Sequence, residues 1–113
     1  MELFAGMPVS DLERAKDFYS GLLGQEPSFL PNDQEAVWTL EGGRHVYVVE
    51  DEERAGGGHV TLFVEDLEEQ AKRAAERGIE PTTDETYSNG VRKLEYHDPD
   101  GNQFGIGGGP QEA

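Results

Sequence analysis

The feature that most constrains the fold of this chain is a short motif that occurs twice. Four residues return 55 positions later, at about half the length of 113 residues: Val9, Asp11, Leu12 and Glu13 recur as Val64, Asp66, Leu67 and Glu68. Each copy lies where an alternating apolar pattern changes to a helical one. A repeat of this kind predicts two copies of one structural unit in tandem.

The first unit, residues 1–50, begins with a predicted strand from Leu3 to Val9, because apolar residues alternate along it. Ser10 or Asp11 can cap the helix that follows, and Ser10 with Glu13 fits a capping box. Gly24 is the expected end of this helix. Three short strands are then predicted around residues 27–30, 36–40 and 45–49.

The second unit, residues 59–106, repeats this order. We predict a strand over 59–64, a helix that Asp66 caps and Gly78 ends, and strands near 80–83, 91–97 and 103–106. Residues 51–58 are charged and then glycine-rich, which is typical of a connector, and residues 107–113 read as a loose tail. The whole chain, residues 1–113, is therefore predicted to be one α+β domain built from tandem βαβββ modules.

Composition limits the classes of partner. The chain has 24 acidic and 9 basic residues and a formal net charge of −15. Phosphate backbones and anionic membrane surfaces repel such a chain, so we expect neither a nucleic-acid nor a membrane partner. A cationic ligand would suit this charge, but solubility or adaptation to a salty cytoplasm is the simpler explanation. There is no cysteine, which excludes disulfides, thiolate metal sites and cysteine nucleophiles.

Two features bear on location. No apolar run reaches the roughly 18 residues that a membrane span needs. The first residues, Met1 to Gly6, lack the basic and apolar regions of a secretion signal. We therefore expect a cytoplasmic protein.

Two motifs carry a resemblance to a known family. The run from Met7 to Tyr19, followed by Leu22-Leu23-Gly24, resembles the opening of glyoxalase/bleomycin resistance/dioxygenase proteins, the vicinal oxygen chelate superfamily. The turn sequence Asp98-Pro99-Asp100-Gly101-Asn102 resembles the same family just before its last strand. The resemblance implies a curved mixed sheet that forms a cup with the helices outside. It also implies pairing of chains, so we expect a homodimer.

Enzymes of this superfamily hold a divalent metal in the cup through histidine and glutamate on the first and last strands of each module. The resemblance places those four positions on Phe4, Tyr47, His59 and Gly105. Only His59 keeps a standard ligand, whereas a catalytic metal site generally needs about three protein ligands. We therefore expect no standard metal site and no bound cofactor, and a divalent metal held by substitute ligands stays an alternative.

A ligand pocket is the predicted use of the cup. Residues out of phase with the aliphatic stripes should face it, and we expect Trp38 and Tyr96 to join from neighbouring strands. The predicted ligand-binding residues are Phe4, Trp38, Tyr47, His59, Phe63 and Gln103. Aromatic walls with a few polar groups are typical of small-molecule sites. The same aromatic rings could equally fill the cup as a core.

Three functions follow from these expectations. The favoured one is a small-molecule-binding protein without the standard metal site, whose ligand is aromatic or cationic. The second is a metal-dependent lyase, isomerase or dioxygenase that uses His59 and substitute ligands. The third is a non-catalytic, dimeric interaction module whose cup is filled by its own side chains.

Overall fold

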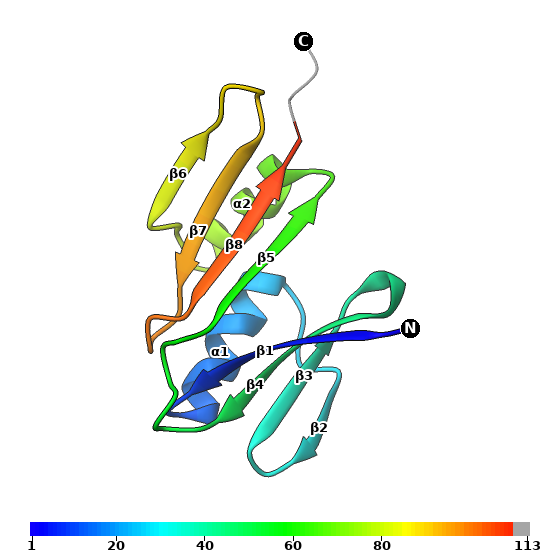
Figure 1. Cartoon of the computed structure of the whole chain (residues 1–113), viewed down its shortest axis with the longest axis vertical. Coiled ribbons are helices and arrows are strands. Elements are labelled where there is room, and N and C mark those ends of the chain that lie inside the picture. The colour runs from blue at the N-terminus through cyan, green and yellow to red at the C-terminus, as the bar shows by residue number, and fades with distance from the viewer. Residues whose placement is uncertain (110–113) are drawn as a thin grey trace.

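The computed structural model describes residues 1–109 and contains two modules of the same construction (Figure 1). The first consists of β1 (Leu3–Val9), α1 (Leu12–Leu23), β2 (Phe29–Asn32), β3 (Glu35–Thr39), a short 3-10 turn (Glu41–Gly43) and β4 (Arg44–Glu50). The second consists of β5 (His59–Val64), α2 (Leu67–Glu76), β6 (Thr83–Thr86), β7 (Arg92–His97) and β8 (Gln103–Gly108). The predicted α+β class with βαβββ modules is confirmed.

Each module forms one mixed four-stranded sheet. The strand orders are β1-β4-β3-β2 and β5-β8-β7-β6, so the two sheets have the same topology. In each sheet the first and last strands are parallel neighbours and the other pairs are antiparallel. The edge strands β1 and β5 contact each other near the end of β1 and then diverge (Figure 1).

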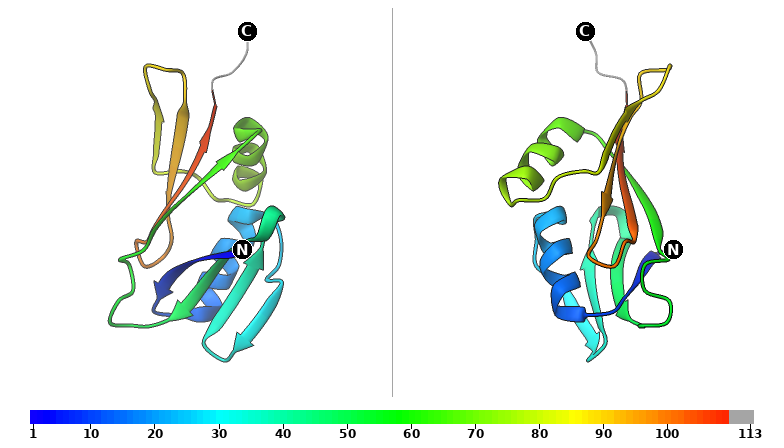
Figure 2. Two further views of the ribbon diagram at one scale, coloured as in Figure 1. Left: turned by 45° about the vertical axis from the view of Figure 1, so that its right-hand side comes forward. Right: turned by 90° about the vertical axis from the view of Figure 1, so that its left-hand side faces the viewer.

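Both helices lie on the same side of the two sheets (Figure 2). We call the opposite side of each sheet the open face. The alternation of side chains along the strands explains this division, since Met7 and Val9 are fully buried toward α1 while Phe4, on the other face of β1, is exposed. The core therefore fills the space between helices and sheets, and it includes Tyr19, Trp38 and Phe104.

Local sequence signals set the ends of the helices. Asp11 caps α1, and its side chain accepts a hydrogen bond from the backbone N–H of Arg14 at 3.1 Å. Asp66 does the same for α2 through Glu69. Gly24 ends α1 in the left-handed conformation with φ of 76°, as predicted.

The turn between β7 and β8 joins the second module to the first. The Tyr19 hydroxyl of α1 donates to Asp98 Oδ2 at 2.8 Å. Asn102 Nδ2 donates to the carbonyl of Pro8 at 2.8 Å, and the backbone N–H of Gly58 donates to Asn102 Oδ1 at 2.6 Å. The backbone N–H of Ser10 donates to Asp100 at 2.9 Å. This turn, residues 98–102, is thus a structural link between the modules.

Three predicted boundaries are wrong. β2 and β6 begin at Phe29 and Thr83, later than expected, because Pro27 and Pro81 lie at the predicted starts and cannot donate to a ladder. β8 continues through Gly107 and Gly108, because both residues pair with β5 and β7. The remainder of the predicted tail, from residue 110, lies outside the described residues.

Candidate open-face site

On the first sheet, Phe4 and His45 form an ordered pair. Their rings stack with centroids 4.1 Å apart and an interplanar angle of 10°. His45 is buried beneath Phe4, with Nε2 2.6 Å from Glu2 Oε1 and Nδ1 3.1 Å from Thr39 Oγ1. A neutral imidazole with its proton on Nε2 satisfies both partners, because it donates to Glu2 and accepts from Thr39. The pair therefore gives this face a fixed aromatic surface.

Tyr47 extends this surface across β1. A Cβ atom placed on Gly6 would lie 2.3 Å from Tyr47 Cζ, so the phenol ring lies flat over the backbone of Gly6. A larger residue at that position would have to displace the ring. Phe4 and Tyr47 line a cleft of about 320 Å³ together with Phe29, Pro31, Glu35 and Val37. We call it the aromatic cleft.

The open face of the second sheet is more polar. His59 Nε2 lies 3.6 Å from Glu95 Oε1, and that oxygen is buried without a hydrogen-bond partner among residues 1–109. Thr61 and Lys93 approach each other over Gly105, and Phe63 lies over Gly107. These side chains come from β5 and β7, on either side of β8, whose glycines form the floor between them.

Five of the six predicted ligand residues lie on or beside the open face. Phe4 and Tyr47 border the aromatic cleft, and Phe63 is exposed over Gly107. His59 and Gln103 are direct neighbours in the β5–β8 ladder. Whether any of them binds a ligand stays a prediction.

Trp38 is the one predicted ligand residue that does not lie on the open face, and Tyr96, which was expected to join the cup, does not lie there either. Both side chains are fully buried on the helix side of their strands. Trp38 contacts Tyr19, and its Nε1–H donates to the carbonyl of Gln25 at 3.1 Å. Along β3 the residues on the open face are Glu35, Val37 and Thr39, so the register places Trp38 in the core.

The residues at the four standard ligand positions do not fit a metal centre of the usual kind. Phe4 has no ligating atom and Gly105 has no side chain, which leaves His59 and the Tyr47 phenol. Within residues 1–109, no group of three or more His, Asp or Glu side chains is arranged to hold a metal ion. The space where a side chain at Gly105 would begin is taken by Lys93, whose Cε lies 2.6 Å from that point.

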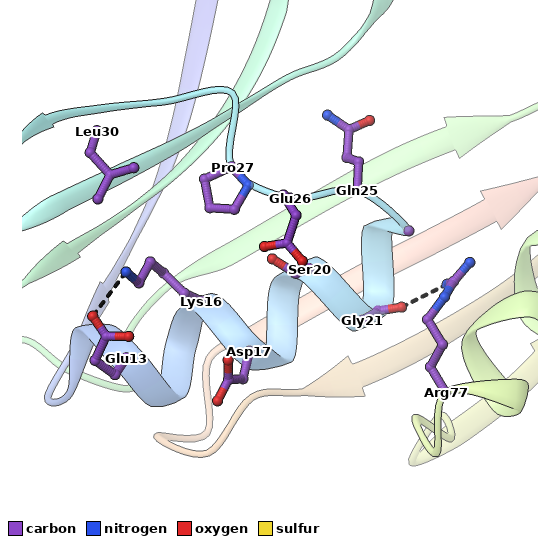
Figure 3. A pocket seen from close by; sticks show the side chains of 11 residues that line it. Glu13, Lys16, Asp17, Ser20, Gly21, Gln25, Glu26, Pro27, Leu30 and Arg77 are labelled. Atoms are coloured by element: carbon purple, nitrogen blue, oxygen red, sulfur yellow. Dashed lines mark hydrogen bonds and ion pairs between the residues drawn. The ribbon is translucent and has the colours of Figure 1, made fainter.

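A separate groove of about 730 Å³ lies on the helix side, beside α1 (Figure 3). Two of its charged side chains form an ion pair, since Lys16 Nζ is 2.9 Å from Glu13, and Arg77 donates to the backbone carbonyl of Gly21 at 2.8 Å. Leu30 of β2 also lines it. We assign no function to this groove.

Sequence reasoning missed Phe29, Lys93 and Glu95 as open-face residues. The period-two pattern of β7 contained the signal, since Lys93 and Glu95 alternate with the buried Leu94 and Tyr96. That pattern indicates on which face of the sheet a side chain lies. It does not indicate in which direction the side chain runs along that face. Lys93 lies over Gly105 only because β8 has glycine there.

The fold and the open face together define a class of protein: a two-module βαβββ domain whose two sheets each leave one face free of helices (Figure 2). The family model described as "Glyoxalase/Bleomycin resistance protein/Dioxygenase superfamily" matches residues 3–106. The chain belongs to this superfamily.

Two solved structures illustrate the likeness. A glyoxalase/bleomycin resistance protein from Catenulispora acidiphila DSM 44928 is 50% identical with a TM-score of 0.94, covering 97% of this chain and 99% of the other. TnmS3, an antibiotic binding protein from Streptomyces sp. CB03234, is 25% identical with a TM-score of 0.77, covering 98% and 96%.

A curated relative is the trivalent organoarsenical cleaving enzyme of Bacillus sp. (strain MD1). It is 33% identical over 109 residues, which cover 88% of this chain and 67% of the relative.

Neither helix in the described part of this chain has the length and hydropathy required to cross a membrane.

Proposed function

We propose that this protein binds a small molecule with a planar aromatic part in the aromatic cleft of the first sheet, without a standard metal site. The observation that carries the proposal is the cleft itself, in which Phe4, Phe29 and Tyr47 surround about 320 Å³ of accessible space. That volume lies at the lower end of the range typical of small-molecule sites.

The exposure of the aromatic side chains supports a binding role over a filled core. Phe4 and Phe29 leave 49% and 46% of their surface accessible to solvent. Contiguous exposed apolar patches mark ligand or partner sites. Glu35 at the border of the cleft adds a carboxylate, which favours a ligand that also carries a positive charge.

The relatives give more support to the binding of a small molecule than to any one particular reaction. TnmS3 is described as an antibiotic binding protein, and we extend the binding of a small organic molecule from it to this chain. The Bacillus relative is named for cleavage of trivalent organoarsenicals. Trivalent arsenic is a soft centre that prefers thiolate ligands, and this chain has no cysteine. We therefore do not extend that substrate.

The test uses two neighbouring residues of β2 that point to opposite faces. Phe29 lines the aromatic cleft, whereas Leu30 lines the groove beside α1. A panel of bleomycin and planar polycyclic antibiotics is screened by thermal shift and isothermal titration calorimetry. We expect Phe29→Ala to weaken binding of a hit by about tenfold or more, because a buried aromatic contact contributes roughly 1.5–3 kcal/mol.

Leu30→Ala is the matched control. It removes a side chain of similar exposure from the same strand, so it should leave the affinity within about twofold of the wild type. Equal losses in both variants, or no binding by any compound in the panel, would contradict the proposal. A hit that binds only after loading with a divalent metal would favour the alternative of a metal-dependent enzyme.

A homodimer is part of this proposal. Leu3 and Phe63 add exposed apolar surface at the diverging edges of β1 and β5. A second chain that covers these edges would remove this apolar surface from water.

A further inference from the structure

The turn between β6 and β7 presents an asparagine followed by a glycine at the tip of a hairpin (Figure 1). Asn89 is exposed, and Gly90 has a φ of 88°, in the left-handed region that favours glycine. The Gly90 N–H donates to the carbonyl of Tyr87 at 2.9 Å, and the Tyr87 N–H donates to the carbonyl of Val91 at 2.8 Å. The turn therefore holds Asn89 in a defined position that is open to water.

A hydrogen bond directs the side chain of Asn89 along the turn. Its Oδ1 accepts from the backbone N–H of Val91 at 3.0 Å, so the side-chain carbonyl lies beside the main chain of the residues that follow. This hydrogen bond also polarises the carbonyl, which makes Cγ more electrophilic. The backbone nitrogen of Gly90 can close a five-membered ring with Cγ, and no side chain on Gly90 shields it.

We propose that Asn89–Gly90 is a site of spontaneous modification, at which water converts the asparagine to aspartate and to β-aspartate. The Gly90 nitrogen attacks Cγ of Asn89 and gives up its proton to the solvent. The bond from Cγ to Nδ2 breaks, and the side-chain nitrogen takes up a proton and leaves as ammonia, so a succinimide ring remains. Water then opens the ring at either carbonyl. One opening restores the ordinary main chain, and the other leaves the main chain running through Cβ and Cγ of residue 89.

Asn32 in the first module provides a matched comparison. It lies where β2 turns into β3, it is exposed, and its Oδ1 accepts from the backbone N–H two residues further on, that of Gln34, at 2.8 Å. The residue after it is Asp33, whose side chain hinders the approach of the Asp33 nitrogen to Cγ. In addition, Nδ2 of Asn32 donates to Glu35 Oε1 at 2.6 Å, which restrains the amide. A similar turn thus occurs once with a following glycine and once without.

The β-aspartate product lengthens the main chain of the turn by one atom. β6 lies at the end of its sheet and pairs with β7, and all four of its residues are exposed. The pair of Thr86 and Arg92 is next to the turn, so the extra atom disturbs this end of the ladder first. Arg92 also joins β6 to α2 through Asp84 and Glu68. We therefore expect the modification to loosen the β6–β7 hairpin and to leave the first module unchanged.

The experiment follows all three asparagines of the folded full chain during incubation in a mildly alkaline buffer. Peptides from samples taken over time are analysed by chromatography and mass spectrometry, which separate aspartate from β-aspartate, and a sample digested without incubation corrects for reaction during the digest. We expect both products at residue 89, at a rate about tenfold or more above that at Asn32, because glycine places no side chain beside the attacking nitrogen. Asn102, which is fully buried and hydrogen-bonded, should stay unchanged.

Two variants and a peptide assign the reaction. Asn89→Gln keeps an amide but requires a larger ring, so the more acidic species that the wild type forms, seen by ion exchange, should not appear. Asp33→Gly gives Asn32 the same neighbour as Asn89 and should create a second modified site. A synthetic peptide of residues 86–92 gives the rate without the fold. The folded chain should react within about tenfold of that rate, since an exposed turn opens readily and releases the Gly90 N–H from Tyr87.

Equal rates at Asn89 and Asn32 in the wild type would overturn the proposal. So would an acidic species that persists in Asn89→Gln, or an Asn89 that is still intact when the peptide has reacted completely. An Asn32 that stays intact in Asp33→Gly would contradict the role assigned to the glycine.

Hydrogen exchange of the modified and unmodified forms, separated by ion exchange, measures the effect on the hairpin. Faster exchange in β6 and β7 is expected, and unchanged exchange there would refute the loosening of the hairpin. None of these outcomes affects the aromatic cleft, because Phe29→Ala and Leu30→Ala test it independently.

Discussion

At the scale of single residues, the buried hydroxyl of Tyr19 connects the hydrophobic core to the turn of residues 98–102. Its ring packs against Trp38 and Phe104, and its hydroxyl donates to Asp98. Burial, and then the neighbouring Asp98 carboxylate, raise the pKa of Tyr19 well above its usual value. The folded protein therefore holds this proton more tightly than the unfolded chain does.

The pH dependence of stability follows from this shift. The contribution of Tyr19 is fully present below its unfolded pKa near 10 and is lost as the pH rises, because only the unfolded chain then releases the proton. For one such tyrosine the loss between pH 8 and pH 11 is about 1.4 kcal/mol. Tyr19→Phe should lower the free energy of unfolding by about 2 kcal/mol at pH 8, since it removes a hydrogen bond to a charged group.

At pH 11 the difference between wild type and Tyr19→Phe should shrink to well under 1 kcal/mol, because only the wild type loses stability through this group. Urea unfolding at the two pH values measures both differences. Tyr87→Phe, which removes a hydroxyl from an exposed ring, should lie close to the wild type at pH 8. A difference for Tyr19→Phe that is constant or grows with pH would contradict the assignment.

At the scale of elements, the turn of residues 98–102 has a structural role. Asp98 also accepts from the backbone N–H of Asn102 at 2.9 Å, which closes the turn before it contacts the first module. Asn102 is fully buried and bridges Pro8 and Gly58. One of the two motifs that carry the family resemblance thus holds the two modules together and contributes no group to the open face.

Asn102→Ala should lower the free energy of unfolding by about 3 kcal/mol. The change removes a buried side chain that makes several hydrogen bonds and leaves the Gly58 N–H without its partner. The matched control is Asn89→Ala in the exposed turn before β7, where one hydrogen bond to the Val91 N–H is lost. We expect about 1 kcal/mol there. Similar values for both variants, measured by urea unfolding, would show that the link between modules is not important for stability.

At the scale of the whole molecule, exposed apolar surface and net charge have opposite effects on the association of two chains. The open faces and strand edges expose Leu3, Phe4, Phe29 and Phe63, and this apolar surface favours association. The net charge of −15 opposes association of two identical chains through repulsion. Salt screens the repulsion and leaves apolar contacts in place, so the ionic strength should control the balance.

We expect a homodimer whose dissociation constant decreases by severalfold or more when NaCl is raised from 0.05 to 0.5 M. Sedimentation equilibrium measures this constant against a chain mass of 12.5 kDa. A protein that stays monomeric at high micromolar concentration in 0.5 M NaCl would refute the homodimer. A dimer that weakens with salt would indicate an interface held by ion pairs.

The elements were largely predictable because their signals are local. Asp11 and Asp66 precede apolar helical stripes, and Gly24 follows one, so the helix ends could be read from neighbouring residues. The assignment of Phe4, Tyr47 and Phe63 to the open face followed from strand alternation. Trp38 was misplaced because its face depends on the register of β3 against β4, which the sequence around it does not reveal.

The sequence by itself determined the two-module fold, because the repeat and the period of two can be read along the chain. The resemblance to the superfamily then placed the four standard ligand positions. Only the tertiary structure revealed the aromatic cleft and the course of Lys93 over Gly105. Phe29 of β2 and Phe4 of β1 come from opposite edges of one sheet to line the same cleft, and Lys93 takes space that Gly105 leaves on another strand. Such meetings depend on strand order and register, which are set by packing between residues far apart in the chain.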